Sequence, residues 1–162
     1  MYKSLIAALA ALGAAGAVAV AAPAPAVSAG SWQRTQVIDL VAEQADDDVI
    51  DLGQPGFGLG DQLLISDVLY RHGARAGTSG GTCQIVKVVD QRVTVNCVTT
   101  LTLRRGQVTV QGLLTVGPGA SGPFDAAITG GSGAYRTAHG QMLITPIDAD
   151  TEHYRLTLMR DH

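Results

Sequence analysis

The stretch Thr129–Gly140, TGGSGAYRTAHG, runs directly into the alternating segment Gln141–Ile147. Within five residues it holds three glycines, Gly130, Gly131 and Gly133. Glycine adopts positive φ, or lies against another backbone, without a Cβ penalty, so this composition predicts a tight turn between two strands. Gly140 falls inside the next expected strand, where a glycine typically marks a bulge, a bend or a close backbone contact.

Alternation of apolar and polar residues continues on both sides of this turn. In Gln107–Val116 one face carries Val108, Val110, Gly112, Leu114 and Val116, and Arg92–Leu103 repeats the pattern. One face of each segment is therefore expected to be buried and the other polar. Such alternation favours antiparallel strands, because strands of all-parallel sheets are apolar on both faces.

The same pattern predicts about eight strands and, after the leader, no amphipathic helix of three turns. The expected strands are Gln33–Gln44, Gln62–Tyr70, Thr82–Val89, Arg92–Leu103, Gln107–Val116, Phe124–Thr129, Gln141–Ile147 and Glu152–Met159. The turns expected between them include Asp46–Asp48, Gly53–Gly60, Gly73–Gly81, Gly117–Gly122 and Ile147–Asp150. An all-β sandwich and a closed barrel both fit this pattern.

The N-terminal residues 1–29 have the features of a secretory signal peptide. Lys3 precedes the uncharged run Leu5–Val20, and Val27-Ser28-Ala29 places small residues before the expected cleavage after Ala29. A retained membrane anchor is the alternative, which the prolines and alanines before Ala29 disfavour. We therefore expect a secreted, extracellular protein, with residues 30–162 forming one domain that has no membrane association after cleavage.

The charge and the aromatic content of the chain limit the partners that it is expected to bind. The chain carries 11 basic and 14 acidic residues, with a formal net charge of −3, and the basic residues are dispersed along the sequence. Few aromatic residues accompany them, so nucleic acid is not an expected partner.

The two cysteines, Cys83 and Cys97, are expected to form a disulfide in an oxidising compartment. A three-residue loop, Val89-Asp90-Gln91, would place Cys83 directly opposite Cys97 on neighbouring strands. A free, buried thiol pair is the alternative.

Four segments, in this order, resemble the landmarks of the allene oxide cyclases and the related dirigent proteins. They are GLGDQLLISDVLY (Gly58–Tyr70), GGTC (Gly80–Cys83), GQVTVQG (Gly106–Gly112) and AITGGSGAYRTAHGQM (Ala127–Met142). This resemblance implies an eight-stranded antiparallel calycin-like β-barrel with an elongated apolar cavity, assembled as a homo-oligomer, a trimer or a dimer. It also implies a hydrophobic small-molecule ligand and no cofactor.

The resemblance implies that this chain has part of the plant cyclase site. Asp39 falls where those cyclases have a pocket glutamate, Val41 replaces their asparagine, and Cys83 matches their cysteine. Asp39 is a candidate catalytic residue if its strand face lines the barrel; the alternative is a solvent-facing aspartate with Ile38 and Leu40 inside. Cys83 is a candidate only if it is not disulfide-bonded.

Other polar residues offer weaker candidates. Tyr135 and Arg136 follow the glycine turn and would orient a ligand carboxylate or carbonyl at a barrel mouth, or simply pack there. The glycine turn precedes a strand, so a phosphate loop, which opens a helix, is not expected. Asp46–Asp48 lacks the spacing of a calcium loop, the histidines have no second ligand at zinc spacing, and no metal is expected.

Two functions follow from these observations. The first is an isomerase-like or cyclase-like barrel that holds one conformer of a hydrophobic molecule and steers its cyclisation, isomerisation or coupling. The second is a non-catalytic barrel that binds a ligand or builds an oligomer. A cavity of about 300 Å³ or more that contains the Asp39 carboxylate would favour the first, and an interior filled by side chains the second.

Overall fold

The structure is a computed structural model that describes residues 34–119 and 122–160. The expected signal peptide, its cleavage site and residues 30–33 lie outside this part of the chain. Within the described residues, no helix is both long and apolar enough to cross a bilayer. The elements are β1 (Arg34–Ile50), β2 (Gln62–Arg71), β3 (Ala74–Val89), β4 (Arg92–Leu103), β5 (Gly106–Val116), β6 (Phe124–Gly131), the 3₁₀ helix η1 (Gly133–Tyr135), β7 (Ala138–Pro146) and β8 (Thr151–Arg160).

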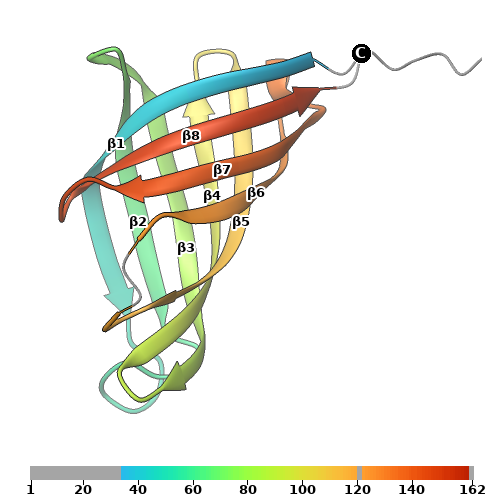
Figure 1. Ribbon diagram of the computed structural model, residues 1–162. Coiled ribbons are helices and arrows are strands. Elements are labelled where there is room, and N and C mark those ends of the chain that lie inside the picture. The colour runs from blue at the N-terminus through green and yellow to red at the C-terminus, as the bar shows by residue number, and fades with distance from the viewer. Residues whose placement is uncertain (1–33, 120–121, 161–162) are drawn as a thin grey trace, which may run out of the picture. The chain divides into compact units, whose positions relative to one another are not determined.

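The eight strands form a closed barrel in chain order, in which every strand is antiparallel to its neighbours. Closure comes from β1, which pairs with β2 on one side and with β8 on the other. In Figure 1, β1, β8 and β7 cross the view side by side, while β2 to β5 run steeply beneath them. The expected eight-stranded antiparallel barrel is confirmed, and the sandwich is excluded.

Alternation sorts the side chains into an interior and an exterior as the sequence predicts. On β5, Val108 and Val110 are 0% and 2% exposed inside the barrel. The outer positions of β4, β5 and β6 instead form polar pairs between strands, as in Thr94–Thr115 at 3.0 Å and Gln111–Asn96 at 3.3 Å. Apolar side chains packed in the interior therefore stabilise the barrel, and hydrogen bonds between polar side chains on the outside of these strands add to this.

The glycine-rich stretch forms the connection between β6 and β7. Here β6 ends at Gly130 and Gly131, η1 begins at Gly133, and Gly140 lies in β7. Gly133 has φ of 60°, and a Cβ there would lie 2.5 Å from the Arg105 carbonyl oxygen. Gly140 has φ of 135°, and a Cβ would lie 2.1 Å from the Thr157 carbonyl oxygen on β8. Both positions need glycine for conformation and for space.

Two of the expected turns are wrong, because they lie within strands. Asp46–Asp48 continues β1, since a bulge between Gln44 and Asp46 lets the strand keep its pairing with β2 to Ile50. The expected turn Gly73–Gly81 ends after Gly73, and the rest belongs to β3. Gly77 serves close packing there, because a Cβ would lie 2.0 Å from the Thr102 carbonyl oxygen on β4.

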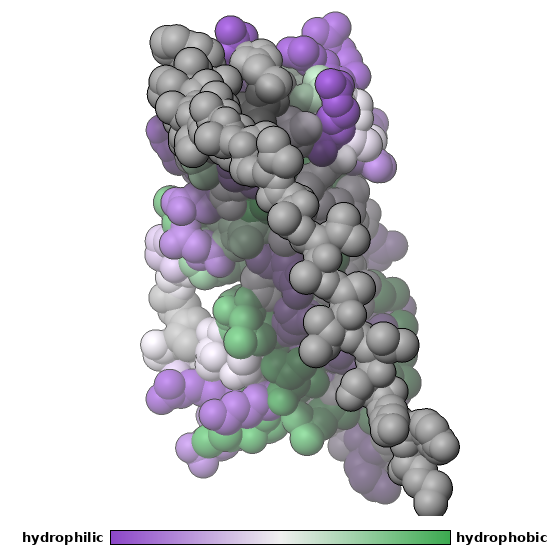
Figure 2. All heavy atoms as spheres, turned by 90° about the vertical axis from the view of Figure 1, so that its right-hand side faces the viewer, coloured by the Kyte–Doolittle hydropathy of each residue, from purple (hydrophilic) through white to green (hydrophobic). Residues whose placement is uncertain are grey.

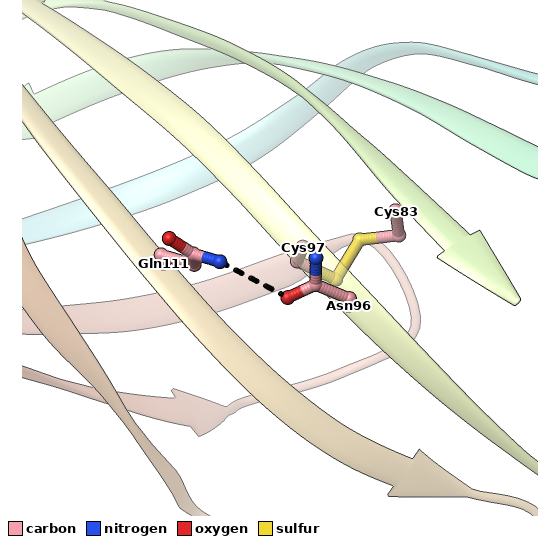
Figure 3. Close-up of a disulfide and its surroundings, with 4 residues drawn as sticks. All are labelled: Cys83, Asn96, Cys97 and Gln111. Carbon is pink, nitrogen blue, oxygen red and sulfur yellow. Dashed lines mark hydrogen bonds between the residues drawn. A yellow bond between two sulfur atoms is a disulfide. The ribbon is translucent and has the colours of Figure 1, made fainter. Parts of the chain in front are cut away.

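The β3–β4 hairpin reaches the expected cysteine pairing by another route. Val89 pairs with Arg92, so the turn has two residues rather than three, and Asp90 takes φ of 55°. A bulge between Ile85 and Lys87 then restores the register, which places Cys83 opposite Cys97. The two cysteines form a disulfide that joins β3 to β4 inside the barrel, as Figure 3 shows.

The loop between β1 and β2 is fixed to the barrel through one buried carboxylate. Asp61 is 1% exposed and accepts hydrogen bonds from the backbone N–H groups of Leu52 at 2.8 Å and Gly58 at 2.7 Å. Its own carbonyl oxygen accepts from the N–H of Ile85 on β3 at 2.9 Å. Asp61 therefore has a structural role at this end of the barrel.

Candidate functional site

The interior of the barrel holds a cavity of about 830 Å³, which is lined by residues from β2 through β8. Its walls are mainly apolar and include Leu63, Ile65, Val110, Leu114, Met142 and Ile144. The Cys83–Cys97 disulfide forms part of the wall. Thr99, Glu152 and Tyr154 supply polar groups. A cavity of this size with few polar groups is typical of small-molecule sites.

A buried hydrogen-bond network supports the polar side of this cavity. Tyr154 on β8 is 5% exposed, and its hydroxyl donates to Oδ2 of Asp67 at 3.2 Å. The Ser79 hydroxyl donates to the same oxygen from β3, where Ser79 lies directly opposite Asp67 of β2. Asp67 and Ser79 are 9% and 4% exposed. The carboxylate of Asp67 therefore orients the phenol of Tyr154 from behind the cavity wall.

Burial alters the acid–base properties of the two titratable groups in the cavity wall. Desolvation raises the pKa of the Glu152 carboxyl; a hydrogen bond with Tyr154 opposes this rise, and the Asp67 charge adds to it. Desolvation also raises the pKa of the Tyr154 phenol, with further contributions from the charges of Asp67 and Glu152. Tyr154 is therefore a proton donor in hydrogen bonds at any physiological pH, and Glu152 is a carboxyl that protonates more readily than an exposed one.

This arrangement suits proton transfer to and from a bound molecule. A phenol has one proton, so Tyr154 hydrogen-bonds either to a carboxylate or to a ligand oxygen or nitrogen. Glu152 can accept a proton and return it, because its raised pKa lies nearer to neutrality than that of an ordinary glutamate. The apolar walls offer contacts to the rest of such a molecule.

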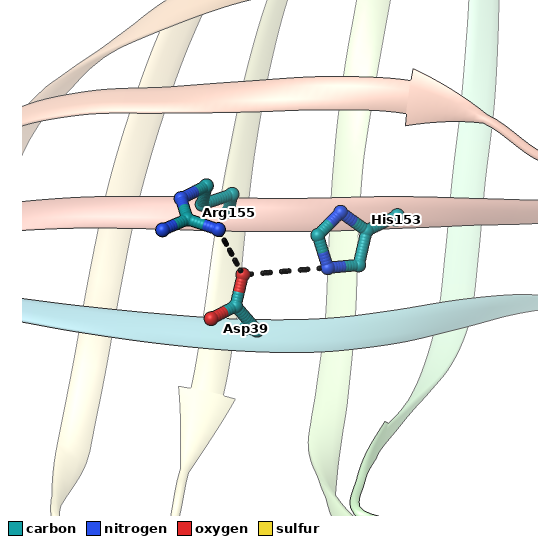
Figure 4. Close-up of polar contacts among 3 residues, drawn as sticks. All are labelled: Asp39, His153 and Arg155. Atoms are coloured by element: carbon teal, nitrogen blue, oxygen red, sulfur yellow. Dashed lines mark hydrogen bonds and ion pairs between the residues drawn. The ribbon is translucent and has the colours of Figure 1, made fainter.

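Asp39 does not lie in this cavity. Its strand face is the outer one, with Ile38 and Leu40 inside the barrel at 3% and 2% exposure. The Asp39 carboxylate is 47% exposed and pairs with His153 and Arg155 of β8, each at 3.4 Å, as Figure 4 shows. The condition set for a catalytic Asp39, a face that lines the barrel, is therefore not met.

The other expected site residues are dispersed. Cys83 is in the disulfide and has no thiol to offer. Tyr135 is 5% exposed and lines a second cavity at the opposite end of the barrel, whereas Arg136 is exposed and is absent from the walls of both cavities. Among residues 34–119 and 122–160, no group of three or more His, Cys, Asp and Glu side chains is placed to hold a metal ion.

A comparison with known protein families shows to which family the chain belongs. The family described as "Allene oxide cyclase barrel like domain" matches residues 36–159. The chain belongs to this family. A search of curated proteins finds no match.

Solved structures give this allene oxide cyclase barrel-like chain several neighbours. A pyocyanin demethylase is 29% identical, with a TM-score of 0.67 over 76% of this chain and 99% of the other. The pterocarpan synthase dirigent protein GePTS1 is 10% identical, with a TM-score of 0.62 over 79% and 86% of the two chains. The Diels Alderase AbmU from Streptomyces koyangensis is 20% identical, with a TM-score of 0.59 over 79% and 64%. The last two share the fold.

The sequence analysis did not predict Asp67, Glu152 or Tyr154 as site residues of this allene oxide cyclase barrel-like chain. A signal was present, because Asp67 falls on the same strand face as the apolar Leu63, Ile65 and Leu69. A charged residue on the apolar face of an alternating strand is a candidate for a buried functional group. Glu152 is harder to find, because it lies only two residues from a turn, where acidic residues are common.

Proposed function

We propose that this barrel binds a hydrophobic small molecule in the 830 Å³ cavity and steers its cyclisation, isomerisation or coupling through proton transfer. Glu152 is the proposed general acid and base, and Tyr154 the proposed hydrogen-bond donor that orients the molecule. Asp67 is a positioning residue, because it holds the Tyr154 hydroxyl without itself lining the cavity.

One observation carries this proposal: the half-buried Glu152 carboxyl and the buried Tyr154 phenol face a mainly apolar cavity. Burying polar groups costs free energy that apolar residues at these positions would not cost. A purely structural interior would have no need of a carboxyl and a phenol side by side. Their position therefore supports a chemical role over simple filling of the barrel.

The reaction class follows from the groups present. Glu152 removes a proton from one atom of the bound molecule and returns it to another, so the protein ends unchanged. The Tyr154 hydroxyl has one proton, so it gives up its hydrogen bond to Asp67 when it donates to the carbonyl, hydroxyl or ring nitrogen on which charge develops. The walls hold one conformer, and orientation of this kind supplies several kcal/mol of the barrier for a cyclisation.

A second candidate activity is demethylation of pyocyanin or of a related compound. The specific observation in its favour is the 29% identity to a pyocyanin demethylase, which this chain matches over 99% of that protein's length. Pyocyanin is therefore the first defined probe for the cavity. A product lighter by one CH₂ group would identify this activity, and a product of unchanged mass would identify an isomerase.

The experiment combines native mass spectrometry with a turnover assay. The protein is incubated with pyocyanin, and separately with a lipid and polyketide extract, to detect retained and converted molecules. Tyr154→Phe and Glu152→Gln are expected to lower turnover at least tenfold while binding is retained, because both variants keep the shape of the cavity. Asp39→Asn, on the outer face, is the control that should leave turnover unchanged.

Three outcomes distinguish a catalytic cavity, a cavity that only binds a ligand, and a cavity without a ligand. Loss of turnover in the cavity variants alone supports a catalytic site. Retention of a molecule with no conversion by the wild-type protein supports the non-catalytic binding barrel instead. If no molecule is either retained or converted, the proposal of a ligand site in this cavity fails.

We also propose that the protein is exported and works as a homo-oligomer. The Cys83–Cys97 disulfide supports an oxidising compartment. Apolar side chains on the outside of β4 and β5 support self-association, because Val98 is 48% and Leu113 is 67% exposed. Native mass spectrometry of the secreted protein tests both, through the mass of its N-terminus and the number of subunits.

A further inference from the structure

A second cavity, of about 380 Å³, opens at the other end of the barrel. Four arginines surround it, Arg71 and Arg75 from the β2–β3 hairpin and Arg104 and Arg105 from the β4–β5 turn. The floor is apolar and includes Ile38, Leu40, Ala76, Leu103 and the ring of Tyr135. None of the described residues that line this cavity is acidic.

None of these four arginines forms a salt bridge with another described residue. Among residues 34–119 and 122–160, salt bridges join only Asp39 to His153 and Arg155. The four guanidinium groups are exposed and share one mouth, so they repel one another in the absence of an anion. A cluster of like charges that costs stability and neutralises no protein carboxylate is typical of an anion-binding site.

The arrangement of charge along the barrel strengthens this interpretation. The turns and loops at the far end carry Asp51, Asp90, Asp148 and Asp150, whereas those at this end carry the arginines. In Figure 2, strongly hydrophilic residues gather at the upper end of the view, the end that carries the β2–β3 and β4–β5 turns in Figure 1. An anion is therefore drawn to this mouth although the chain as a whole is acidic.

A packed layer separates this cavity from the larger one. On β4, Thr99 lines the larger cavity, Leu103 lines the smaller one, and Leu101 between them is 0% exposed. Leu101 belongs to the same core cluster as three residues of other strands that are also 0% exposed, Leu69 of β2, Val108 of β5 and Leu156 of β8. Two residues advance about 6.6 Å along a strand, so the cavities are distinct sites on opposite sides of one side-chain layer.

We propose that the arginine-lined mouth is a second ligand site, which binds a small organic anion: an oxyanion group, such as a carboxylate, attached to a short apolar body. Guanidinium groups match the planar, bidentate geometry of a carboxylate. The apolar floor, formed in part by Leu40 and Tyr135, takes the body of the molecule. This site does not depend on the function proposed for the larger cavity.

The test uses benzoate as the probe, with the neutral benzamide and inorganic sulfate as comparisons. Dissociation constants are measured by isothermal titration calorimetry at constant ionic strength, because surface charge effects change with salt. The wild-type protein should bind benzoate at least tenfold more tightly than benzamide or sulfate. Arg71→Gln with Arg104→Gln should raise the dissociation constant for benzoate at least tenfold.

Three control variants make the result specific. Lys87→Gln with Arg92→Gln removes the same charge at the other end of the barrel and should leave benzoate binding unchanged. Tyr154→Phe alters the larger cavity and should also leave it unchanged. Arg75→Gln with Arg105→Gln repeats the main test from the same two turns, should the first double variant fail to fold.

Several results would overturn the proposal. These are failure of the wild-type protein to bind benzoate, equal binding of benzoate and benzamide, and equal weakening by the arginine and the far-end double variants. Binding of sulfate as tightly as benzoate would overturn the assignment of an organic anion. Loss of benzoate binding in Tyr154→Phe would place the ligand in the larger cavity and would overturn a second site, whether or not that cavity supports turnover.

Discussion

The side of a strand on which a residue falls decides what the same side chain does in this barrel. Asp39 and Asp67 are both strand aspartates; the first is 47% exposed at the side chain and pairs with His153 and Arg155. Asp67 is 9% exposed and accepts hydrogen bonds from Ser79 and Tyr154. Exposed ion pairs contribute little to stability, whereas a buried carboxylate needs its partners.

Glu152 gives a prediction about pH. Its pKa is raised in the folded protein above the value of 4.5 that it has without the barrel around it. The folded state therefore binds more protons between 4.5 and the raised pKa, and stability falls as pH rises through this window. Glu152→Gln removes this effect, so the stability of the variant relative to wild type should increase with pH across the window and then level off.

Urea unfolding at a series of pH values measures this difference. Glu43→Gln is the matched control, because Glu43 lies on the neighbouring strand β1 and is exposed to solvent. The wild-type protein and this control should lose stability in parallel. A constant difference between Glu152→Gln and wild type over the whole range would contradict the raised pKa.

At the level of the elements, the sequence predicts strands well and turns less well. Alternation locates all eight strands, and the cysteines identify the β3–β4 pairing. The Asp46–Asp48 and Gly73–Gly81 turns are wrong for one reason: turn-forming residues also occur where a strand bulges or where two backbones pack closely. Which of these applies depends on the neighbouring strand, and the local sequence does not contain that information.

Gly140 tests the need for glycine inside a strand. Gly140→Ala would force alanine into a φ of 135° and place its Cβ against the Thr157 carbonyl of β8. We expect a loss of at least about 2 kcal/mol in the free energy of unfolding. Gly80→Ala in β3 is the control, because its nearest atom would be 3.9 Å away, and it should change stability by less than about 1 kcal/mol. Equal effects in the two variants would contradict the requirement.

The disulfide gives a second prediction for the elements. Cys83 and Cys97 are 14 residues apart, so the bond closes a loop of this size in the unfolded chain and lowers its conformational entropy. Replacing both by alanine should lower the free energy of unfolding by about 3 kcal/mol. Reduction of the wild-type protein by a thiol should lower its thermal midpoint in the same direction. Unchanged unfolding in both experiments would show that the bond does not stabilise the barrel.

The whole molecule shows what local patterns leave out. The arginines at one mouth come from positions as far apart as Arg71 and Arg105, and in the sequence they are dispersed. Asp67 and Tyr154 likewise meet only because β2, β3 and β8 enclose the same interior. Family resemblance predicts the barrel and a cavity; the groups that face each cavity depend on strand register and on closure.

Closure of the barrel also creates the packed layer between the two cavities. A substitution at Leu101 tests how tightly this layer is packed. This side chain is 0% exposed between the two hollow ends, so Leu101→Ala leaves a void that joins onto them. We expect a loss of about 3 kcal/mol in urea unfolding, because the apolar contacts are lost and a cavity remains. Leu113→Ala is the matched control, since Leu113 is 67% exposed on the outside of β5 and should contribute less than about 1 kcal/mol. A cost for Leu101→Ala as small as that of the control would mean that the layer is not tightly packed, and that the barrel has one continuous interior.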